Sequence, residues 1–562
     1  MTALRSQPLD AAQAGRFKQA LGLLQSGQRT QALSMAEALA KQAPQAADAW
    51  QLLGMCLAEN DRPAHASTAF ERALDLLPGN AAISRNYGMF LAKHGKALRE
   101  QDQLEAAEPI LRKALALSPD LVFALTDLGV VLRMLGRIEE ALTAFRQAQG
   151  LLHQRGMDRP ELQDAINGVL ADAGRTEEAL AGARQLVIRH PEHAPAHETL
   201  GNLLWENGAE LAPRTDPLDA FRAAARAQPG NHALQLALVR MLLAAKRAEE
   251  ALALLHPLRR QQPGNAVLDW FTADALSTLQ QHEQAAPLYA ATARSELGKL
   301  PDFLNAHARH AFRTRHFDLA ADLAEKVVRI DPHNQEGWSN LGVAWRLSGD
   351  EREHWLCDYE RLVGYVEIPS PPGHGDLPAF LQTLAATLEA MHSAKRQPVN
   401  QSVRGGTQTP GQLFGRDDAL IHAAELALRT AVENWIASLP EDATHPFLSR
   451  KRHSVRFVGS WSVRLASSGR HSNHIHPRGW ASSAFYVALP GSVLGSGNTS
   501  HAGWIQFGQP LENLGLDLPP RRVIRPKPGH LALFPSYLWH GTVPFDDPES
   551  RLTIAFDMQP KA

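Results

Sequence analysis

Residues 50–78 read WQLLGMCLAENDRPAHASTAFERALDLLP, and this stretch decides the fold of the first part of the chain. It contains large residues at fixed intervals, a small residue where two helices cross, and a proline that stops the second helix. These positions are Trp50, Leu53, Gly54, Leu57, Ala66, Phe70, Ala73 and Pro78. The intervals predict a helix-turn-helix unit of about 34 residues.

The same pattern recurs along the first 350 residues. Further units open at Tyr87-Gly88, Leu128-Gly129 and Leu341-Gly342, and the prolines Pro191 and Pro332 are each followed by a glycine at the crossing position. The chain resembles tetratricopeptide (TPR) proteins, with about eight or nine repeats over residues 10–350. That resemblance implies an α-solenoid whose groove binds a protein or peptide, and the named aromatic and alanine residues are interpreted as helix packing.

Composition excludes several classes of protein. Lys and Arg number 57 against 59 Asp and Glu, a net charge of −2, so no basic field is available for nucleic acid or an anionic membrane. Two cysteines, Cys56 and Cys357, are too few for a disulfide framework or a thiolate cluster. Residues 1–17 lack an apolar signal segment, and no apolar run approaches about 18 residues. We expect a cytoplasmic protein with no nucleic-acid or membrane partner.

The second part of the chain has a different pattern. Residues 367–375 contain Pro-Ser-Pro-Pro-Gly-His-Gly, which cannot continue a helix. We predict a solenoid over residues 1–352, a helical linker over 353–396 and a separate domain over 397–562. Within the last part, β-branched and aromatic residues alternate, which predicts short strands of an antiparallel sandwich or barrel at 454–465, 481–489, 503–507, 530–534 and 551–558.

Three histidines in this part are candidate metal ligands. On an extended chain His474 and His476 point to one face and can place two imidazole nitrogens on one ion. His540 follows an apolar strand and offers a third ligand. With so few cysteines in the chain, histidine and carboxylate are the ligands left for a metal.

A candidate anion clamp follows. Arg551 and Thr553 share one face of a strand and offer a guanidinium fork and a hydroxyl to one carboxylate. Metal ligands beside a carboxylate clamp indicate an oxo acid chelated to iron.

These motifs together resemble a known family of enzymes. The matching strings are His474-Ile475-His476-Pro477, Gly503-Trp504-Ile505, Trp539-His540-Gly541 and Arg551-Leu552-Thr553, with Arg404 to Thr409 as a further part. They are similar to the 2-oxoglutarate- and Fe(II)-dependent oxygenases of bacteria that often carry TPR repeats. The resemblance implies a double-stranded β-helix (jelly roll), with His474 and His540 as catalytic iron ligands and Arg551, assisted by Thr553, binding 2-oxoglutarate. The fold class is therefore α+β and multidomain, with an all-α solenoid before the jelly roll.

The sequence departs from the wider superfamily at His476, where Asp or Glu usually completes a facial triad. Three alternatives are open. His476 is itself a ligand, or it lies outside the coordination sphere and iron keeps two protein ligands, or a carboxylate such as Asp546 or Asp547 enters from a loop.

The leading hypothesis for function is a hydroxylase-type dioxygenase that uses Fe(II), 2-oxoglutarate and molecular oxygen, with the TPR array recruiting a protein or peptide. Two alternatives are a cupin-like three-histidine enzyme that does not use 2-oxoglutarate and a TPR scaffold with a degenerate barrel. Arg525 is a candidate second contact for a carboxylate, and other candidate pocket residues are Trp461, Arg464, Tyr486, Trp504 and Gln506.

Overall fold

The computed structural model describes residues 6–211, 216–394, 396–399 and 401–561. The chain divides into two compact units, Met1–Val169 and Leu170–Ala562. Residues 1–5, which belong to the N-terminal segment predicted to lack a signal sequence, lie outside the described residues, as does residue 400 of the predicted C-terminal domain. Among the described helices, none has the length and apolar character that crossing a bilayer requires.

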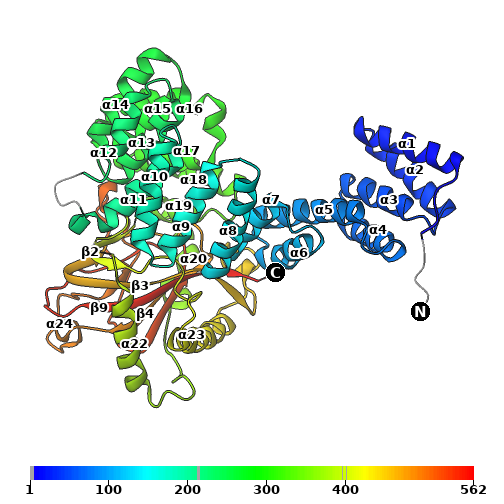
Figure 1. Cartoon of the computed structure of the whole chain (residues 1–562). Helices are drawn as coiled ribbons and strands as arrows, with labels where there is room; N and C mark the ends of the chain where they lie inside the picture. The colour runs from blue at the N-terminus through cyan, green and yellow to red at the C-terminus, as the bar shows by residue number, and fades with distance from the viewer. Residues whose placement is uncertain (1–5, 212–215, 395, 400, 562) are drawn as a thin grey trace. The chain divides into compact units, whose positions relative to one another are not determined.

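The first unit consists of paired helices (Figure 1), in which the small residues of the repeat pattern permit close packing. A Cβ atom on Gly54 would lie 2.8 Å from the ring of Phe70, and one on Gly129 would lie 2.6 Å from Phe145. The helices are α1 (Ala11–Gln25), α2 (Arg29–Gln42), α3 (Ala47–Glu59), α4 (Pro63–Leu76), α5 (Ala81–Glu100), α6 (Leu104–Leu117), α7 (Val122–Met134), α8 (Ile138–Gln154) and α9 (Pro160–Asp172), the last of which crosses into the second unit.

The turns between repeats follow from a Pro-Gly-Asn sequence. Helix α4 ends before Pro78, Gly79 has a φ of +74°, and the side chain of Asn80 accepts a hydrogen bond from the backbone of Ile83 at the start of α5. The proline stops one helix, the glycine adopts a left-handed conformation without strain, and the asparagine caps the next helix.

The second unit begins with more helices of the same kind. They are α10 (Thr176–Arg189), α11 (Ala194–Leu211), α12 (Asp219–Ala227), α13 (His232–Ala244), α14 (Ala248–Gln261), α15 (Ala266–Thr278), α16 (His282–Ala293), α17 (Pro301–Arg313), α18 (Phe317–Ile330), α19 (Gln335–Ser348), α20 (Arg352–Leu356) and α21 (Tyr359–Leu362), with the 3-10 turn η1 (Glu296–Lys299).

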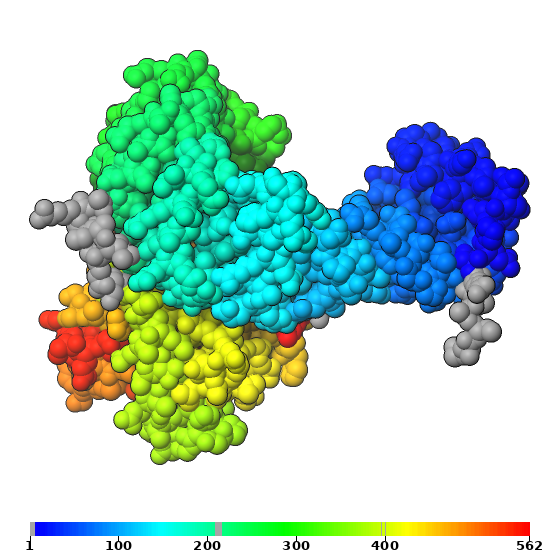
Figure 2. Space-filling view, in the orientation of Figure 1, coloured from blue at the N-terminus to red at the C-terminus, as the bar shows by residue number. Residues whose placement is uncertain are grey.

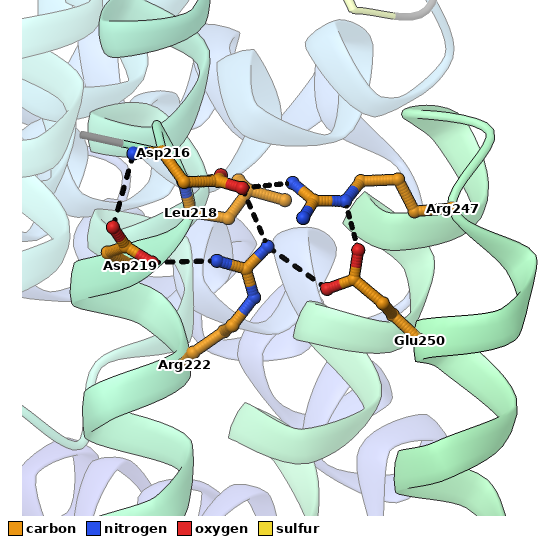
Figure 3. Close-up of polar contacts among 6 residues, drawn as sticks. All are labelled: Asp216, Leu218, Asp219, Arg222, Arg247 and Glu250. Atoms are coloured by element: carbon orange, nitrogen blue, oxygen red, sulfur yellow. Dashed lines mark hydrogen bonds and ion pairs between the residues drawn. The ribbon is translucent and has the colours of Figure 1, made fainter. Parts of the chain in front are cut away.

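A network of charges fixes the short helix α12 against α14 (Figure 3). Arg222 on α12 forms ion pairs with Asp216 at 3.1 Å, Asp219 at 2.8 Å and Glu250 on α14 at 3.1 Å. Arg247 contacts Asp216 at 2.6 Å and pairs with Glu250. Because two arginines share three carboxylates, this network orients the helices better than isolated surface pairs do.

The β domain of this unit has two antiparallel sheets. One sheet has the order β1-β7-β4-β9-β3-β2 and the other the order β6-β5-β8. The strands are β1 (Gly364–Glu367), β2 (Val403–Gln408), β3 (Val455–His471), β4 (Ala481–Ala488), β5 (Ile505–Phe507), β6 (Arg522–Ile524), β7 (His530–Pro535), β8 (His540–Thr542) and β9 (Arg551–Pro560). The helical elements of the domain are α22 (Leu377–Met391), α23 (Ala419–Ser438), α24 (Gly491–Leu494), η2 (Leu448–Arg450) and η3 (Glu512–Leu514).

Helices α22 and α23 pack on the larger sheet. Alternate residues of β9, Leu552, Ile554, Phe556 and Met558, belong to the same buried core as apolar side chains of α22 and α23. The last repeat helix joins this core through Leu341 and Trp345, and Figure 2 shows blue-green repeat helices of this unit bordering segments coloured lime and orange. The other face of β9 is thereby left for the space between the sheets.

These elements confirm the predicted fold class, a helical repeat part followed by a β domain. Residues 353–396, predicted as a helical linker broken at 367–375, also contain the strand β1, which was not predicted and pairs with β7 (Gly364 opposite Leu533). Its partner lies far along the sequence, and four residues are too few to show a period of two.

Candidate metal centre

A small pocket with a cavity volume of about 40 Å³ lies between the two sheets. Its walls come from both sheets and from the segment that enters β2. The lining includes Ser402, Val403, Trp461, His471, His474, His476, Ser483, Ile505, His540, Arg551, Thr553 and Ala555.

Three histidines converge in this pocket. His474 follows β3 and pairs with His540 of β8 through two backbone hydrogen bonds of 2.9 and 3.1 Å, which place their rings 4.2 Å apart. His476 lies two residues further on, with its ring 5.1 Å from that of His540. One ring nitrogen from each of His474, His476 and His540 lies within 4.8 Å of the others, so the three can hold one metal ion.

Each histidine is anchored through Nδ1. The Nδ1 of His474 lies 2.8 Å from the carbonyl oxygen of Ser472, that of His540 lies 2.9 Å from the carbonyl of Leu538, and that of His476 lies 2.9 Å from the carboxylate of Asp557. Since carbonyls and carboxylates only accept hydrogen bonds, each Nδ1 donates its proton. The unprotonated Nε2 atoms are then available as ligands.

Burial keeps the rings of His474 and His540 neutral. Burial, reinforced by the neighbouring rings of His540 and His476, holds the pKa of His474 well below 6.5. Burial and His476 lower the pKa of His540 in the same direction. Neutral imidazole is the form that binds a metal, so these two ligands need not lose a proton first at neutral pH.

Arg551 is a buried cation without an acidic partner among the described residues. Its side chain is 1% exposed, and its Nε and Nη1 make no hydrogen bond. The guanidinium carbon lies 5.1 Å from the centre of the Tyr486 ring, and the buried Tyr486 hydroxyl has no partner other than Arg551 among the described residues. Burial lowers the pKa of Arg551, but a guanidinium still carries its charge at neutral pH. Unpaired buried charge is costly, so this pair of donors fits an anionic ligand.

One face of β9 supplies four residues to this region. Arg551, Thr553 and Ala555 line the pocket, and Asp557 contacts His476. Alternate residues of a strand share a face, which is why the spacing from Arg551 to Thr553 was a usable signal. The Thr553 hydroxyl donates a long hydrogen bond of 3.5 Å to the carbonyl of Val463.

The carboxylates offered from a loop lie elsewhere. Asp546 is exposed and accepts a hydrogen bond from Ser467, while Asp547 accepts from the backbone of Ser492 and Glu549. Arg525 donates to the carbonyls of Leu494 and Gly495. None of these three side chains lines the pocket.

The other candidates have varied positions. Trp461 lines the pocket and stacks on His476 with ring centres 5.9 Å apart. Gln506 donates to Asn473 at 2.9 Å, and Trp504 stacks on His501. Arg464 pairs in the sheet with Leu552 of β9 and Thr407 of β2.

Sequence reasoning missed Asp557 and Ser402. Asp557 is 9% exposed and accepts hydrogen bonds from His476 and from Ser482 at 2.7 Å. Its signal was present, because Asp557 continues the face of Arg551 and Thr553 along β9. Ser402, whose hydroxyl lies 3.2 Å from Nε2 of His474, has no such signal because it approaches from a distant segment.

Comparison with known families agrees with this arrangement. Residues 459–557 match the family described as "Putative 2OG-Fe(II) oxygenase". Residues 17–81, 92–156, 272–334 and 305–351 match the tetratricopeptide repeat family. The chain thus combines segments that match TPR repeats with a C-terminal segment that matches this oxygenase family.

Several solved structures are similar to segments of this chain. One titled "MamA AMB-1 C2221" is 23% identical, with a TM-score of 0.25, covering 32% of this chain and 98% of the other. Another, from Pseudomonas aeruginosa and titled as a functional characterization of pilF, is 21% identical with a TM-score of 0.27, covering 39% and 93%. No curated protein matches the chain.

Proposed function

We propose that this protein is a 2-oxoglutarate- and Fe(II)-dependent oxygenase of the hydroxylase type, with a TPR array that recruits a protein or peptide. The observation that carries the proposal is Arg551, a buried guanidinium without an acidic partner in the described chain, in the pocket where three histidines converge. A metal ligand set alone fits many enzymes, whereas an anion clamp beside it fits an oxo acid that is also bound by the metal.

In this proposal His474, His476 and His540 hold Fe(II) through Nε2, and Asp557 fixes His476 in the tautomer that presents Nε2. The carboxylate of Asp557 also places a negative charge next to His476, at the distance of one hydrogen bond. In this proposal that charge replaces the charge of the Asp or Glu ligand of the wider superfamily.

Arg551 would bind the distal carboxylate of 2-oxoglutarate, with Tyr486 and Thr553 as further donors. Fe(II) and 2-oxoglutarate, when bound, supply the activation of molecular oxygen that oxidises a C–H bond while the oxo acid is decarboxylated to succinate. The protein's own contribution is to orient the oxo acid and to limit water in a pocket walled by Trp461, Ile505 and Val403.

The two sheets are proposed to be those of a double-stranded β-helix. His474 extends the smaller sheet by pairing with His540, and His540 pairs on its other side with Phe507. The metal ligands then lie on the smaller sheet and the anion clamp on the larger one. The predicted ranges 1–352, 353–396 and 397–562 remain proposals for the domain limits.

The test is an anaerobic titration with Fe(II), with and without 2-oxoglutarate, that follows the visible charge-transfer band of the chelate. Wild type should give a band that needs both components, and Arg551→Ala should weaken 2-oxoglutarate binding by at least about 30-fold, since it removes a desolvated charge partner. The matched control is Arg525→Ala, whose side chain donates to backbone carbonyls outside the pocket and should leave the band unchanged.

The cupin-like alternative is favoured by the neutral three-histidine set. It predicts that iron binds without the charge-transfer band of the chelate and that Arg551→Ala does not change iron binding. The scaffold alternative predicts no stoichiometric iron binding in either protein.

A further inference from the structure

The connection between β5 and β6 packs against the last repeat helices. We call residues 508–519 the docking loop. Four of its leucines join a cluster with Ala311, Phe312, Val343 and Ala344 of α17 and α19, and Leu514 is 1% exposed. These leucines are Leu511, Leu514, Leu516 and Leu518, while Glu512 and Asp517 between them are exposed. The loop contains the turn η3, from whose last residue onward the alternate residues Leu514, Leu516 and Leu518 all contact the repeat helices, as the apolar side chains of a peptide do on a helical surface.

Two arginines of the repeats hold the backbone of the docking loop. Arg346 on α19 donates to the carbonyl of Gly508 at 2.7 Å and to that of Pro519 at 2.7 Å, so one guanidinium closes both ends of the loop. Arg313 on α17 donates to the carbonyl of Asn513 at 3.2 Å. Charge-assisted bonds to main-chain carbonyls, together with apolar side-chain contacts, are how a groove binds an extended peptide.

The opposite side of the docking loop contacts the candidate metal centre. Gly508 donates its N–H to the carbonyl of Trp539 at 2.8 Å, and the Asn473 side chain donates to the carbonyl of Pro510 at 3.2 Å. Trp539 and Asn473 directly precede His540 and His474. Asn473 also packs on Gly541, where a Cβ would lie 2.2 Å from its Oδ1.

We propose that the docking loop is a built-in peptide ligand of the last two repeats, and that its docking positions the backbone of His474 and His540. The second clause rests on the proposed metal centre, whereas the first does not. Because the surface of α17 and α19 is then filled by the chain itself, a partner protein must bind to other repeats.

The experiment compares full-length wild type with Arg346→Gln. The control is Arg240→Gln, which removes an arginine that pairs with Glu198 on another repeat, away from the loop. Loss of two charge-assisted hydrogen bonds should make cleavage by a glutamate-specific protease after Glu512 about tenfold faster. Hydrogen exchange at residues 472–474 and 538–541 should also become about tenfold faster, while Arg240→Gln changes neither rate.

Each measurement tests one of the two parts of the proposal. Unchanged cleavage after Glu512 overturns the docking of the loop. Faster cleavage with unchanged exchange at 472–474 and 538–541 overturns the positioning of the two histidines. Since neither readout needs a metal, failure of the proposed oxygenase function would appear separately, as absence of Fe(II) binding by wild type.

A second variant keeps the docking clause testable if Arg346→Gln does not fold. In Leu514→Ala the loop loses its most buried side chain, and protease cleavage after Glu512 should again become faster. A chain in which residues 511–518 are replaced by a short glycine-serine linker should bind a synthetic peptide of residues 508–519, and wild type should not. Binding of that peptide to neither chain would count against a peptide groove.

Discussion

Two clusters of three histidines can be compared in the second unit, and among its described residues only the cluster of His474, His476 and His540 brings its ring nitrogens close enough to hold one metal ion. In the repeats, His307 and His310 stack on Tyr289 with ring centres 4.9 and 4.7 Å away, and His282 lies 5.7 Å from His310. In the β domain, the ring centres of His474, His476 and His540 are 5.0, 4.2 and 5.1 Å apart, whereas that of His310 lies 6.4 Å from that of His307. The rings of the β-domain cluster are therefore closer together, and the contacts of the ring nitrogens add to this difference.

A further difference lies in what holds each Nδ1. In the repeats, Nδ1 of His310 lies 2.9 Å from the hydroxyl of Ser277, but the buried Nδ1 atoms of His282 and His307 have no hydrogen-bond partner among the described residues. All three Nδ1 atoms of the β-domain cluster donate to a carbonyl or carboxylate. A fixed Nδ1 directs Nε2 to a common point, and a stacked ring without an anchor fills space between helices. The comparison teaches that the hydrogen bonds that fix each Nδ1, more than the number of histidines, mark a metal site.

The largest expected effect separates the two clusters directly. His540→Ala should weaken Fe(II) or Co(II) binding by at least about 100-fold, since it removes a ligand. His310→Ala, in the repeat cluster, should leave the affinity for the metal unchanged. Isothermal titration under anaerobic conditions measures both, and equal losses would show that the metal binds elsewhere.

Removing the anchor but keeping the ligand should have the next largest effect. Asp557→Asn keeps an acceptor for Nδ1 of His476 but removes the negative charge, and should weaken metal binding by about 10- to 100-fold. Asp546→Asn and Asp547→Asn are matched controls, because these carboxylates lie outside the pocket. A loss in either control that equals the loss in Asp557→Asn would favour a loop carboxylate as the ligand.

The repeat cluster should respond to acid instead of metal. Burial lowers the pKa of His307 and of His310 to about 4, so between pH 6.5 and 4 the unfolded chain binds more protons than the folded one. The free energy of unfolding should therefore fall as the pH drops through this window, by about 2 kcal/mol for one such histidine. His307→Phe, which keeps the stacking on Tyr289, should reduce this loss in denaturant melts of the second unit. The exposed His232→Phe should not.

The smallest expected effect on metal binding concerns the hydroxyl of Ser402, which contacts a ligand nitrogen of the proposed metal site. The hydroxyl of Ser402 lies 3.2 Å from Nε2 of His474 and 3.0 Å from Nδ1 of His471. A metal at Nε2 must displace that contact, so Ser402→Ala should bind Co(II) a few times more tightly, as expected for about 1 kcal/mol. Weaker binding would instead make Ser402 a support of the ligand set.

Much of this architecture is readable from local sequence. The repeat glycines predicted helix crossings that the structure shows at Gly54 and Gly129, and the alternating pattern of residues 551–558 predicted β9. The two-residue spacings of His474 with His476 and of Arg551 with Thr553 predicted shared faces, and both pairs line one pocket. Each of these signals spans one turn of helix or a few residues of strand.

What could not be predicted depends on contacts between distant segments. Asp557 reaches His476, and Ser402 reaches His474, only because β9 and β2 both flank β3. The cluster that contains Leu514 and Phe312 brings together a loop of the β domain and a helix of the repeats. No period or spacing encodes such contacts, since they follow from how the sheets and helices assemble.

Strand β9 lies at the centre of the larger sheet, between β4 and β3. Because Arg551, Thr553 and Asp557 are all carried by this one strand, a shift of its register by one residue would turn all three away from the pocket and bring Leu552 and Ile554 into it. The anion clamp and the histidine anchor are therefore gained or lost together. Amide protons along β9 should exchange only when the whole β domain unfolds, so the site is as durable as the domain itself.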